Sequence, residues 1–468
     1  MISQSCFKIV DILFQNEMLQ HNPKFGSRNG TIESLFWILF NEEKILRFLY
    51  TILFYLALPF IFLRLLWRSR RVPDNRKRWS ERLGFCPFQL KECIWVHAVS
   101  VGESIAAIPL IKKLKIEYPY MPIVVTTMTV TGAARIQAIM GNEVLHTLIP
   151  YDLPDAVARF LKRICPRIVI IMETELWPNL FAACKRRAIP IVIINARLSE
   201  KSMNGYKKIP VLTKKMLSAI SAVASQGQQD AERFITLGIL PDKVMVTGNI
   251  KFDLEIPDYV SIASPSLREQ LGLGRFIWIA ASTHPTEENS ILSAHRLIQK
   301  NYPTALLILV PRHPDRFNTV ASLCKQQDFT LIRRSENAIC SLQTEIYLGD
   351  TMGELLLLYS VADVVFVAGS FADVGGHNML EPAALHKPIL SGPKLFNFAE
   401  ISNMLLTGNA MRIVNQAEEL AETIQTLFSA TELRQQMGEN AYQVIEKNRG
   451  ALYRQIQLIR KNVIFSIN

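Results

Sequence analysis

Short apolar runs alternate with longer, mixed segments throughout this sequence from Leu90 onward. Apolar strands separated by helices are typical of a parallel sheet that is covered by helices on both faces. The alternation therefore predicts a doubly wound α/β fold for the first half, which closes near Asn249. The runs expected to form its strands are IWVHAVS, PIVVTTMT, RIVIIMETE, PIVIINAR, SAVASQ and KVMVTGN.

The alternation stops over residues 257–274, which are polar, and then restarts. In the second half the expected strands are FIWIAAST, ALLILVPRHP, FTLIRRS, EIYLGD, DVVFVAGS and KPILSGP. Because 468 residues exceed what one hydrophobic core usually supports, two domains are expected. We place the first over residues 68–256 and the second over residues 257–468, with the final helices packing back onto the first. Many α/β enzymes share this organisation, so it leaves the function open.

An uncharged run, FLYTILFYLALPFIFL at residues 48–63, precedes both halves. With the apolar residues up to Trp67 it approaches the ~20 residues that cross a bilayer, so we predict a membrane anchor over residues 45–67. A buried or surface-lying helix is the alternative, and Pro59 would kink either form. Whether the anchor spans the membrane or lies on it stays open. Residues 1–44 form an extension without a recognisable motif.

Basic residues follow this apolar run closely, and they are Arg64, Arg68, Arg70, Arg71, Arg76, Lys77, Arg78 and Arg82. Because positively charged flanks remain in the cytoplasm, we expect both domains on that side. These cations would also bind anionic lipid headgroups, at about 1 kcal/mol each near the surface. The formal net charge of +11 favours an anionic partner. The basic residues are concentrated beside the apolar run, which argues against nucleic acid as the partner.

The seven cysteines are scattered and include no Cys-x-x-Cys pair, so the sequence predicts neither a disulfide framework nor a zinc site. A reducing, cytoplasmic setting is favoured. The sequence also lacks an Asp-x-Asp metal motif, a Walker lysine loop and Gly-x-Gly-x-x-Gly. These absences argue against metal-dependent sugar transfer, ATP hydrolysis and NAD chemistry.

Carboxylates follow two of the expected strands in the first half. HAVSVGES places Glu103 beside Gly102 at the carboxyl end of a strand, where open α/β sheets bind ligands. METELWPN ends the third expected strand, and an extended backbone would put Glu173 and Glu175 on one face with Thr174 on the other. The alternatives are an ordinary first-turn acid at Glu103, which the helix dipole favours, and an exposed loop at METELWPN.

Cationic and turn-forming residues follow strands in the second half. PRHP supplies Arg312, a planar donor suited to a phosphate, together with His313. A surface ion pair is the alternative for this arginine. GDTMGEL, at residues 349–355, is a second turn that enters a helix from a strand end.

The strongest indication of a nucleotide site is Gly369-Ser370 followed by GGHNMLEPAA at residues 375–384. Glycines allow backbone N–H groups to approach a phosphate, and a helix beginning near Asn378 would direct its positive end at it. Glu381 lies one turn further on, where its carboxylate could accept both hydroxyls of a ribose.

Ten ordered stretches together resemble the Kdo (3-deoxy-D-manno-octulosonic acid) transferases of lipopolysaccharide assembly. These stretches are HAVSVGE, VTTMTVTG, PYDLP, METELWPN, NARLS, GNIKFD, STHPTEE, LVPRHPDRF, GDTMGEL and GGHNMLEPAA. The resemblance runs from about Leu49 to the end and leaves residues 1–47 outside it. It implies the GT-B architecture, in which two Rossmann-like doubly wound domains face a cleft.

The resemblance also implies a reaction and a location. The reaction is the transfer of Kdo from CMP-Kdo, with inversion at the anomeric carbon, to lipid IVA, a phosphorylated lipid A precursor. The location is the bacterial inner membrane, with the catalytic domains in the cytoplasm. No metal and no other cofactor is implied.

By motif, Glu103 matches the family's general base, and Glu173 and Lys251 match groups that assist the transition state. The positions that match the CMP site are Arg312, His313, Gly353, Glu354, Leu355, Asn378, Met379, Leu380 and Glu381. Met379 stands where some members of the family have proline.

Two other functions compete with this one. Another GT-B enzyme, such as a nucleotide-sugar epimerase or a transferase with a UDP donor, would have to recognise a diphosphate. A membrane-tethered binding module would have lost turnover, and the intact Glu103 counts against that. The number of Kdo residues added and the oligomeric state stay open.

Overall fold

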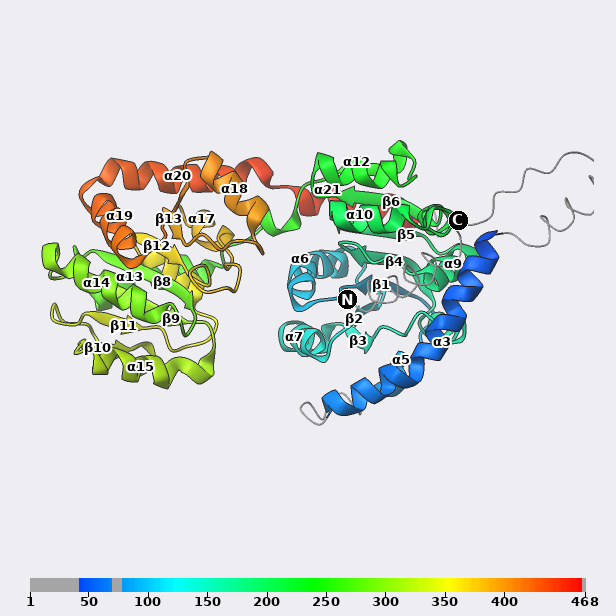
Figure 1. Cartoon of the computed structure of the whole chain (residues 1–468), viewed down its shortest axis with the longest axis horizontal. Coiled ribbons are helices and arrows are strands. Elements are labelled where there is room, and N and C mark those ends of the chain that lie inside the picture. Colours follow the sequence, from blue (N-terminus) through cyan, green and yellow to red (C-terminus); the bar gives the residue numbers. More distant parts are fainter. Residues whose placement is uncertain (1–41, 70–77, 465–468) are drawn as a thin grey trace, which may run out of the picture. The chain divides into compact units, whose positions relative to one another are not determined.

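A computed structural model describes residues 42–69 and 78–464 of the chain. The chain divides into two compact units, which are shown in Figure 1. The first unit comprises Met1–Ile250 and Gly450–Asn468, and the second comprises Lys251–Arg449.

The chain leaves the first unit earlier than the predicted boundary at residue 256. Phe252 is buried in the core of the second unit, together with Leu267 and Leu271, so this segment already belongs to that unit. The last helix, α21 (Ala451–Ile464), belongs to the first unit again.

A seven-stranded parallel sheet forms the centre of the first unit, in the order β3-β2-β1-β4-β5-β6-β7. Its strands are β1 (Cys93–His97), β2 (Ile123–Thr127), β3 (Leu145–Leu148), β4 (Pro166–Met172), β5 (Ile191–Ala196), β6 (Ile220–Ser225) and β7 (Val244–Val246). The chain builds outward from β1 in one direction and from β4 in the other. Open α/β sheets bind ligands at the carboxyl ends of the strands where the direction reverses, which here is between β1 and β4.

Helices connect these strands and cover both faces of the sheet (Figure 1). Besides α21, they are α3 (Glu42–Ser69), α5 (Trp79–Arg82), α6 (Val101–Glu117), α7 (Val130–Met140), α8 (Pro154–Ile164), α9 (Pro178–Arg186), α10 (Glu200–Lys207), α11 (Pro210–Leu217) and α12 (Gln228–Thr236).

The second unit repeats this architecture with a parallel sheet in the order β10-β11-β9-β8-β12-β13-β14. Its strands are β8 (Ile277–Thr283), β9 (Leu306–Pro311), β10 (Leu331–Arg333), β11 (Ile346–Leu348), β12 (Val364–Val367), β13 (Ile389–Ser391) and β14 (Met411–Ile413). Its helices are α13 (Asp258–Leu271), α14 (Glu288–Asn301), α15 (Phe317–Gln326), α16 (Leu355–Val361), α17 (Leu380–Ala384), α18 (Ala399–Thr407), α19 (Ala417–Ser429) and α20 (Thr431–Asn448). The corresponding reversal lies between β8 and β12.

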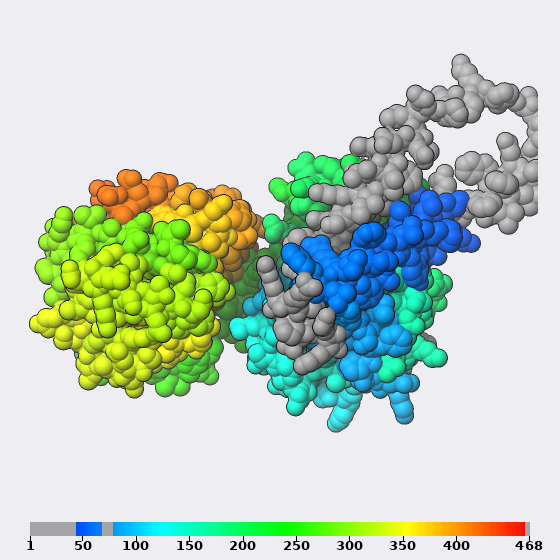
Figure 2. Space-filling view, turned by 60° about the horizontal axis from the view of Figure 1, so that its bottom comes forward, coloured from blue at the N-terminus to red at the C-terminus, as the bar shows by residue number. Residues whose placement is uncertain are grey.

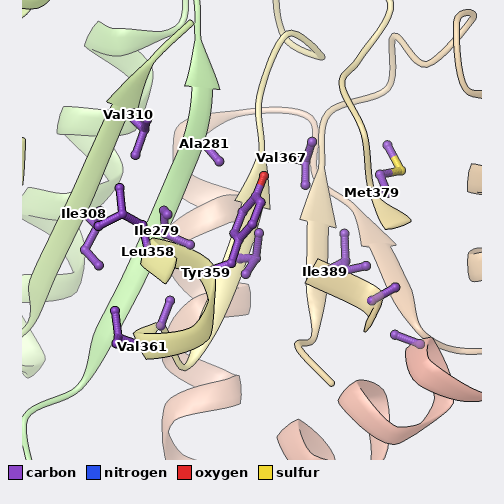
Figure 3. Close-up of a cluster of buried hydrophobic side chains, with 14 of the residues drawn as sticks. Ile279, Ala281, Ile308, Val310, Leu358, Tyr359, Val361, Val367, Met379 and Ile389 are labelled. Carbon is purple, nitrogen blue, oxygen red and sulfur yellow. The ribbon is translucent and has the colours of Figure 1, made fainter. Parts of the chain in front are cut away.

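Continuous apolar strands fill the core of each unit because helices cover both sheet faces. Successive side chains of a strand point to opposite faces. Trp278 and Ala280 therefore pack in one cluster, while Ile279 and Ala281 pack in another. Figure 3 shows the second of these clusters, which also contains Met379.

One cation that was predicted to bind lipid headgroups serves the fold instead. Arg82 is buried and donates hydrogen bonds to the carbonyls of Ile149 and Met128, so the prediction is wrong for this residue. Arg78 forms an ion pair with Glu81 at 2.7 Å. The predicted headgroup ligands Arg70, Arg71, Arg76 and Lys77 lie outside the described residues.

Candidate active site

Glu103 lies in the first turn of α6, directly beyond the carboxyl end of β1. Its carboxylate accepts hydrogen bonds from the backbone N–H groups of Val99, at 2.9 Å, and Ser100, at 3.3 Å. In return, the Glu103 N–H donates to Ser100 Oγ at 3.2 Å. This reciprocal arrangement is a capping box, so the helix-capping alternative for Glu103 is present in the structure. The side chain is also half-buried, at the sheet edge where ligands bind.

Glu173 and Glu175 follow β4, the fourth strand of the chain and the neighbour of β1 in the sheet. Glu173 has φ of 56°, so the extended backbone ends at Met172. The prediction that alternation places Glu173 and Glu175 on one face is therefore wrong, because the chain turns between the strand and these side chains.

The three glutamates, Glu103, Glu173 and Glu175, form what we call the glutamate cluster. Burial, together with the negative charges of Glu103 and Glu173, raises the pKa of Glu175 to about 7. Its carboxylate accepts a hydrogen bond from Trp177 Nε1 at 2.8 Å. The cluster therefore combines a half-buried carboxylate, Glu103, with a second carboxyl, Glu175, that holds a proton close to neutral pH.

Two residues border this cluster without any clear signal in the sequence. Tyr206 of α10 lies close enough for the charge of Glu175 to raise its pKa further, beyond the effect of burial. His97 is buried at the end of β1, where its ring meets the Trp177 ring edge-on. Burial lowers the pKa of His97 to about 4, so the imidazole is neutral.

In the second unit, three histidines meet beyond the carboxyl ends of β8, β9 and β12. We call His284, His313 and His377 the histidine cluster. The Nε2 atoms of His284 and His377 lie 2.9 Å apart, and their rings stack with centroids 5.1 Å apart. The ring of His313 lies edge-on to His284 at 5.6 Å.

Arg312 stands beside the histidine cluster and is exposed. Burial, together with the positive charge of Arg312, lowers the pKa of His377 to about 4. Burial also raises the pKa of Glu381, while the same arginine opposes that change. Arg312 thus lies close enough to His377 and Glu381 to influence the pKa of both. An anionic ligand bound here would neutralise the positive charge of Arg312.

The Gly369-Ser370 turn binds a carboxylate of the protein itself. Glu287, which is fully buried, accepts hydrogen bonds from the N–H groups of Gly369 at 2.8 Å and Ser370 at 2.9 Å. It also accepts from the N–H groups of Phe371 and His284. The prediction that the Gly369 and Ser370 N–H groups approach a phosphate is therefore wrong, because these donors are already occupied.

The segment 378–381 contributes two polar side chains and two core side chains. Asn378 donates to Glu381 at 3.0 Å and accepts from the Leu380 N–H at 3.1 Å. The helix α17 begins at Leu380, later than predicted, and is five residues long. Met379 and Leu380 are buried in the core, as Figure 3 shows for Met379, so only their backbone atoms can face a ligand.

Gly353, Glu354 and Leu355 form the turn that enters α16. Gly353 has φ of 88°, a conformation that favours glycine. The Glu354 carboxylate forms two hydrogen bonds with Arg334, at 2.8 and 3.0 Å, so its side chain is held by the protein. Any ligand contact at this turn would use backbone groups of Glu354 and Leu355.

Lys251 is exposed in the short helical turn where the second unit begins. The glutamate cluster belongs to the first unit, whereas Lys251 and the histidine cluster belong to the second. Within residues 42–69 and 78–464, no group of three or more His, Cys, Asp or Glu side chains is arranged to hold a metal ion.

Comparison with known proteins identifies the family. Residues 77–254 match the family described as 3-deoxy-D-manno-octulosonic-acid transferase (Kdotransferase), and residues 275–444 match glycosyl transferases group 1. The 3-deoxy-D-manno-octulosonic acid transferase of Haemophilus influenzae is 43% identical over 420 residues, which cover 88% of this chain and 98% of that protein. The chain belongs to the Kdo transferase family. This finding confirms the resemblance predicted from the ordered motifs.

Two solved structures are also similar to this Kdo transferase. The C-terminal CMP-Kdo binding domain of WaaA from Acinetobacter baumannii is 34% identical. The match covers 40% of this chain and 98% of the WaaA domain, with a TM-score of 0.39. The UDP-GlcNAc 2-epimerase from Neisseria meningitidis is 15% identical. The match covers 79% of this chain and 100% of the epimerase chain, with a TM-score of 0.52. The epimerase likeness shows the GT-B-like fold alone and says nothing about activity.

In this Kdo transferase, the sequence did not predict roles for His284 and His377 of the histidine cluster. It also did not predict a role for Glu287, whose carboxylate accepts a hydrogen bond from the His284 N–H. His284 and Glu287 both lie in STHPTEE, directly after a strand, and His377 lies in GGHN. Their positions after strand ends were the available signal, since that edge of a parallel sheet holds ligands.

Proposed function

We propose that this Kdo transferase moves Kdo from CMP-Kdo to lipid IVA, with inversion at the anomeric carbon. The glutamate cluster at the carboxyl edge of β1 and β4 is the observation that carries this proposal. It sets a half-buried carboxylate at the reversal point of the first sheet, where an acceptor hydroxyl can be deprotonated. The arginine and imidazoles at the matching edge of the second sheet suit an anionic donor.

Glu103 is the proposed general base. A sugar hydroxyl of the acceptor attacks the anomeric carbon of Kdo, the new C–O bond forms as the bond to the CMP phosphate breaks, and Glu103 takes the hydroxyl proton. Ionised Glu103 has acceptor sites beyond those used by the Val99 and Ser100 N–H groups. Glu173 is proposed to assist the transition state from the same cluster.

Arg312, Lys251 and the histidine cluster are proposed to stabilise the donor and the departing CMP. CMP-Kdo carries a phosphate and a carboxylate, and the leaving group is a monophosphate with no pyrophosphate to bridge. Cations and imidazole donors of the protein would supply the required charge stabilisation without a metal ion. Asn378, Glu381 and the backbone of Gly353, Glu354, Leu355, Met379 and Leu380 are proposed to hold the CMP portion.

The proposed location is the bacterial inner membrane, with both units on the cytoplasmic side. Within the described part of the chain, one helix is long and apolar enough to cross a membrane by length and composition, namely Lys44–Trp67 in α3. An acceptor that is itself a membrane lipid supports this location.

The test is a reconstituted reaction of the purified full chain with CMP-Kdo and detergent-dispersed lipid IVA. We expect release of CMP in the presence of a metal chelator and formation of Kdo-lipid IVA, with mass spectrometry giving the number of Kdo residues added. Glu103→Gln should reduce turnover by roughly 10²- to 10⁴-fold. Full activity of that variant would contradict the general-base assignment, and no transfer by the wild-type chain would contradict the acceptor or donor.

A further inference from the structure

The helix α3 lies along the surface of the first unit, and one of its faces is packed against that unit (Figure 2). Phe54 is 5% exposed and packs with Tyr151, Leu153 and Ala156. The helix residues that support this contact recur every three or four positions, which places them on one face. They are Tyr50, Leu58, Ile61 and Leu65.

Polar contacts hold the same face of α3 in place. Asn179 at the start of α9 donates to Thr51 Oγ1 at 3.0 Å. The Tyr55 hydroxyl donates to Asp155 of α8 at 2.6 Å. From Tyr50 to Leu65 the packed face is about 22 Å long at 1.5 Å per residue, so contact with the first unit extends over most of the apolar segment.

The opposite face of α3 is an uncharged apolar stripe that is exposed. Four strongly exposed members are Leu56 (65%), Phe60 (74%), Leu63 (62%) and Trp67 (66%). They follow one another at intervals of three or four residues, and Ile45, Phe48, Leu49 and Ile52 continue the same face toward the start of the helix. An apolar stripe of this size on a surface marks a binding site for a partner.

We infer that α3 lies in the plane of the membrane surface, with this stripe immersed in lipid and the opposite face still packed on the first unit. This inference rests on the proposed membrane association. It specifies that α3 binds the membrane from its surface and does not cross it. A helix that crosses the bilayer must have lipid or another spanning segment on every side. Crossing would therefore break the Thr51–Asn179 and Tyr55–Asp155 hydrogen bonds and expose the buried Phe54 face.

Charge supports lipid as the partner, in preference to a second protein. Lys44 and Arg64 are exposed on this helix, and the sequence continues with Arg68, Arg70, Arg71, Arg76 and Lys77. An uncharged apolar face bordered by cations is typical of helices that lie at anionic membrane surfaces. Such a helix would hold the first unit, with its glutamate cluster, at the leaflet that contains a lipid acceptor.

A cross-linking experiment in membranes tests this arrangement. Thr51→Cys and Asn179→Cys are combined in the full chain, with the exposed Cys165 replaced by serine. Isolated membranes are then treated with a short bifunctional thiol reagent. We expect the membrane-bound chain to cross-link as fully as the detergent-extracted chain. Cross-linking only after extraction would show that α3 leaves the first unit in the membrane, and would overturn the inference.

A matched control uses Phe60→Cys with Asn179→Cys, because Phe60 lies on the face that points away from the first unit. This pair should not cross-link in either state.

The topology of the chain in the membrane gives a second measurement, which needs no cysteine. Tags at both ends of the chain should be digested from the same side of sealed membrane vesicles, and digestion from opposite sides would show a spanning helix.

The stripe itself is tested with Leu56→Ser and Phe60→Ser together. We expect the ratio of membrane-bound to soluble chain to fall by at least about tenfold. The control is Ile262→Ser, an exposed apolar residue of the second unit, which should leave that ratio unchanged. An unchanged ratio for the stripe variant would overturn the inference. These measurements need no turnover, so failure of the proposed reaction would leave their outcome intact.

Discussion

Glu103 and Ser100 cap the first turn of α6 for one another. The Glu103 N–H donates to Ser100 Oγ, and the Ser100 N–H donates to the Glu103 carboxylate. The proposed general base is therefore also a structural group, and these two roles are separable by substitution.

Glu103→Gln should keep the fold and lose the reaction. Glutamine at this position also completes a capping box, so we expect the free energy of unfolding to stay within about 0.5 kcal/mol of the wild-type value. Ser100→Ala should show the reverse pattern, losing about 1 kcal/mol of stability with a smaller loss of turnover. Urea denaturation and CMP release measure both quantities, and equal losses of activity in the two variants would contradict this separation.

Glu175 should make the stability of the protein depend on pH. Its pKa is about 7 in the folded protein, against an ordinary value of 4.5. The stability that this group contributes is complete below about pH 4.5 and is lost as the pH rises through about 7, because ionisation then places a charge in a site shielded from water and beside two other carboxylates. Glu175→Gln should remove this decline. Urea midpoints at about pH 5 and about pH 8 measure this loss of stability in the wild-type chain and in the variant. An equal change of midpoint in the two proteins would contradict the prediction.

Removal of the Glu287 carboxylate should destabilise the second unit strongly. Glu287→Ala leaves buried N–H groups of Gly369, Ser370, Phe371 and His284 without an acceptor. We expect a loss of about 3–5 kcal/mol in the free energy of unfolding. The exposed Glu400→Ala serves as control and should change it by less than about 0.5 kcal/mol. A similarly small effect at Glu287 would show that the turn does not depend on the carboxylate.

Gly369→Ala should displace the His377 ring. A β-carbon at this position would lie 2.6 Å from His377 Cδ2, and the backbone has φ of +73°. We expect a loss of about 1–3 kcal/mol in stability and weaker binding of CMP, measured by calorimetry. Gly205→Ala is the control, because nothing lies within 4 Å of the added carbon. Unchanged CMP affinity in Gly369→Ala would place the donor away from the histidine cluster.

Every interior strand could be predicted from the sequence, whereas only two of the four edge strands, β7 and β10, could. The two strands that the apolar pattern missed are β3 and β14, and each lies at the edge of its sheet. LHTL and MRI are only partly buried, so their sequences lack the continuous apolar run that two-sided burial requires.

In the site, residue types at strand ends were predictable, and the partners of each group were not. Alternation fails at Glu173 because its backbone adopts positive φ. Gly369 and Ser370 form a turn that binds an anion, but the anion is Glu287, which comes from a distant part of the sequence. Local patterns cannot show which of several anions a set of N–H groups will bind.

The return of α21 to the first unit sets an order for folding during synthesis. Ile456, Ile459 and Val463 pack with strand residues such as Ile94 and Ile168, and Gln455 donates to Thr247 at 3.2 Å. The ribosome makes the entire second unit before these side chains appear. One face of the first sheet therefore stays incompletely covered until α21 has been made, whereas α3 precedes the rest of the first unit. The nascent chain therefore presents α3 before its first unit is able to close.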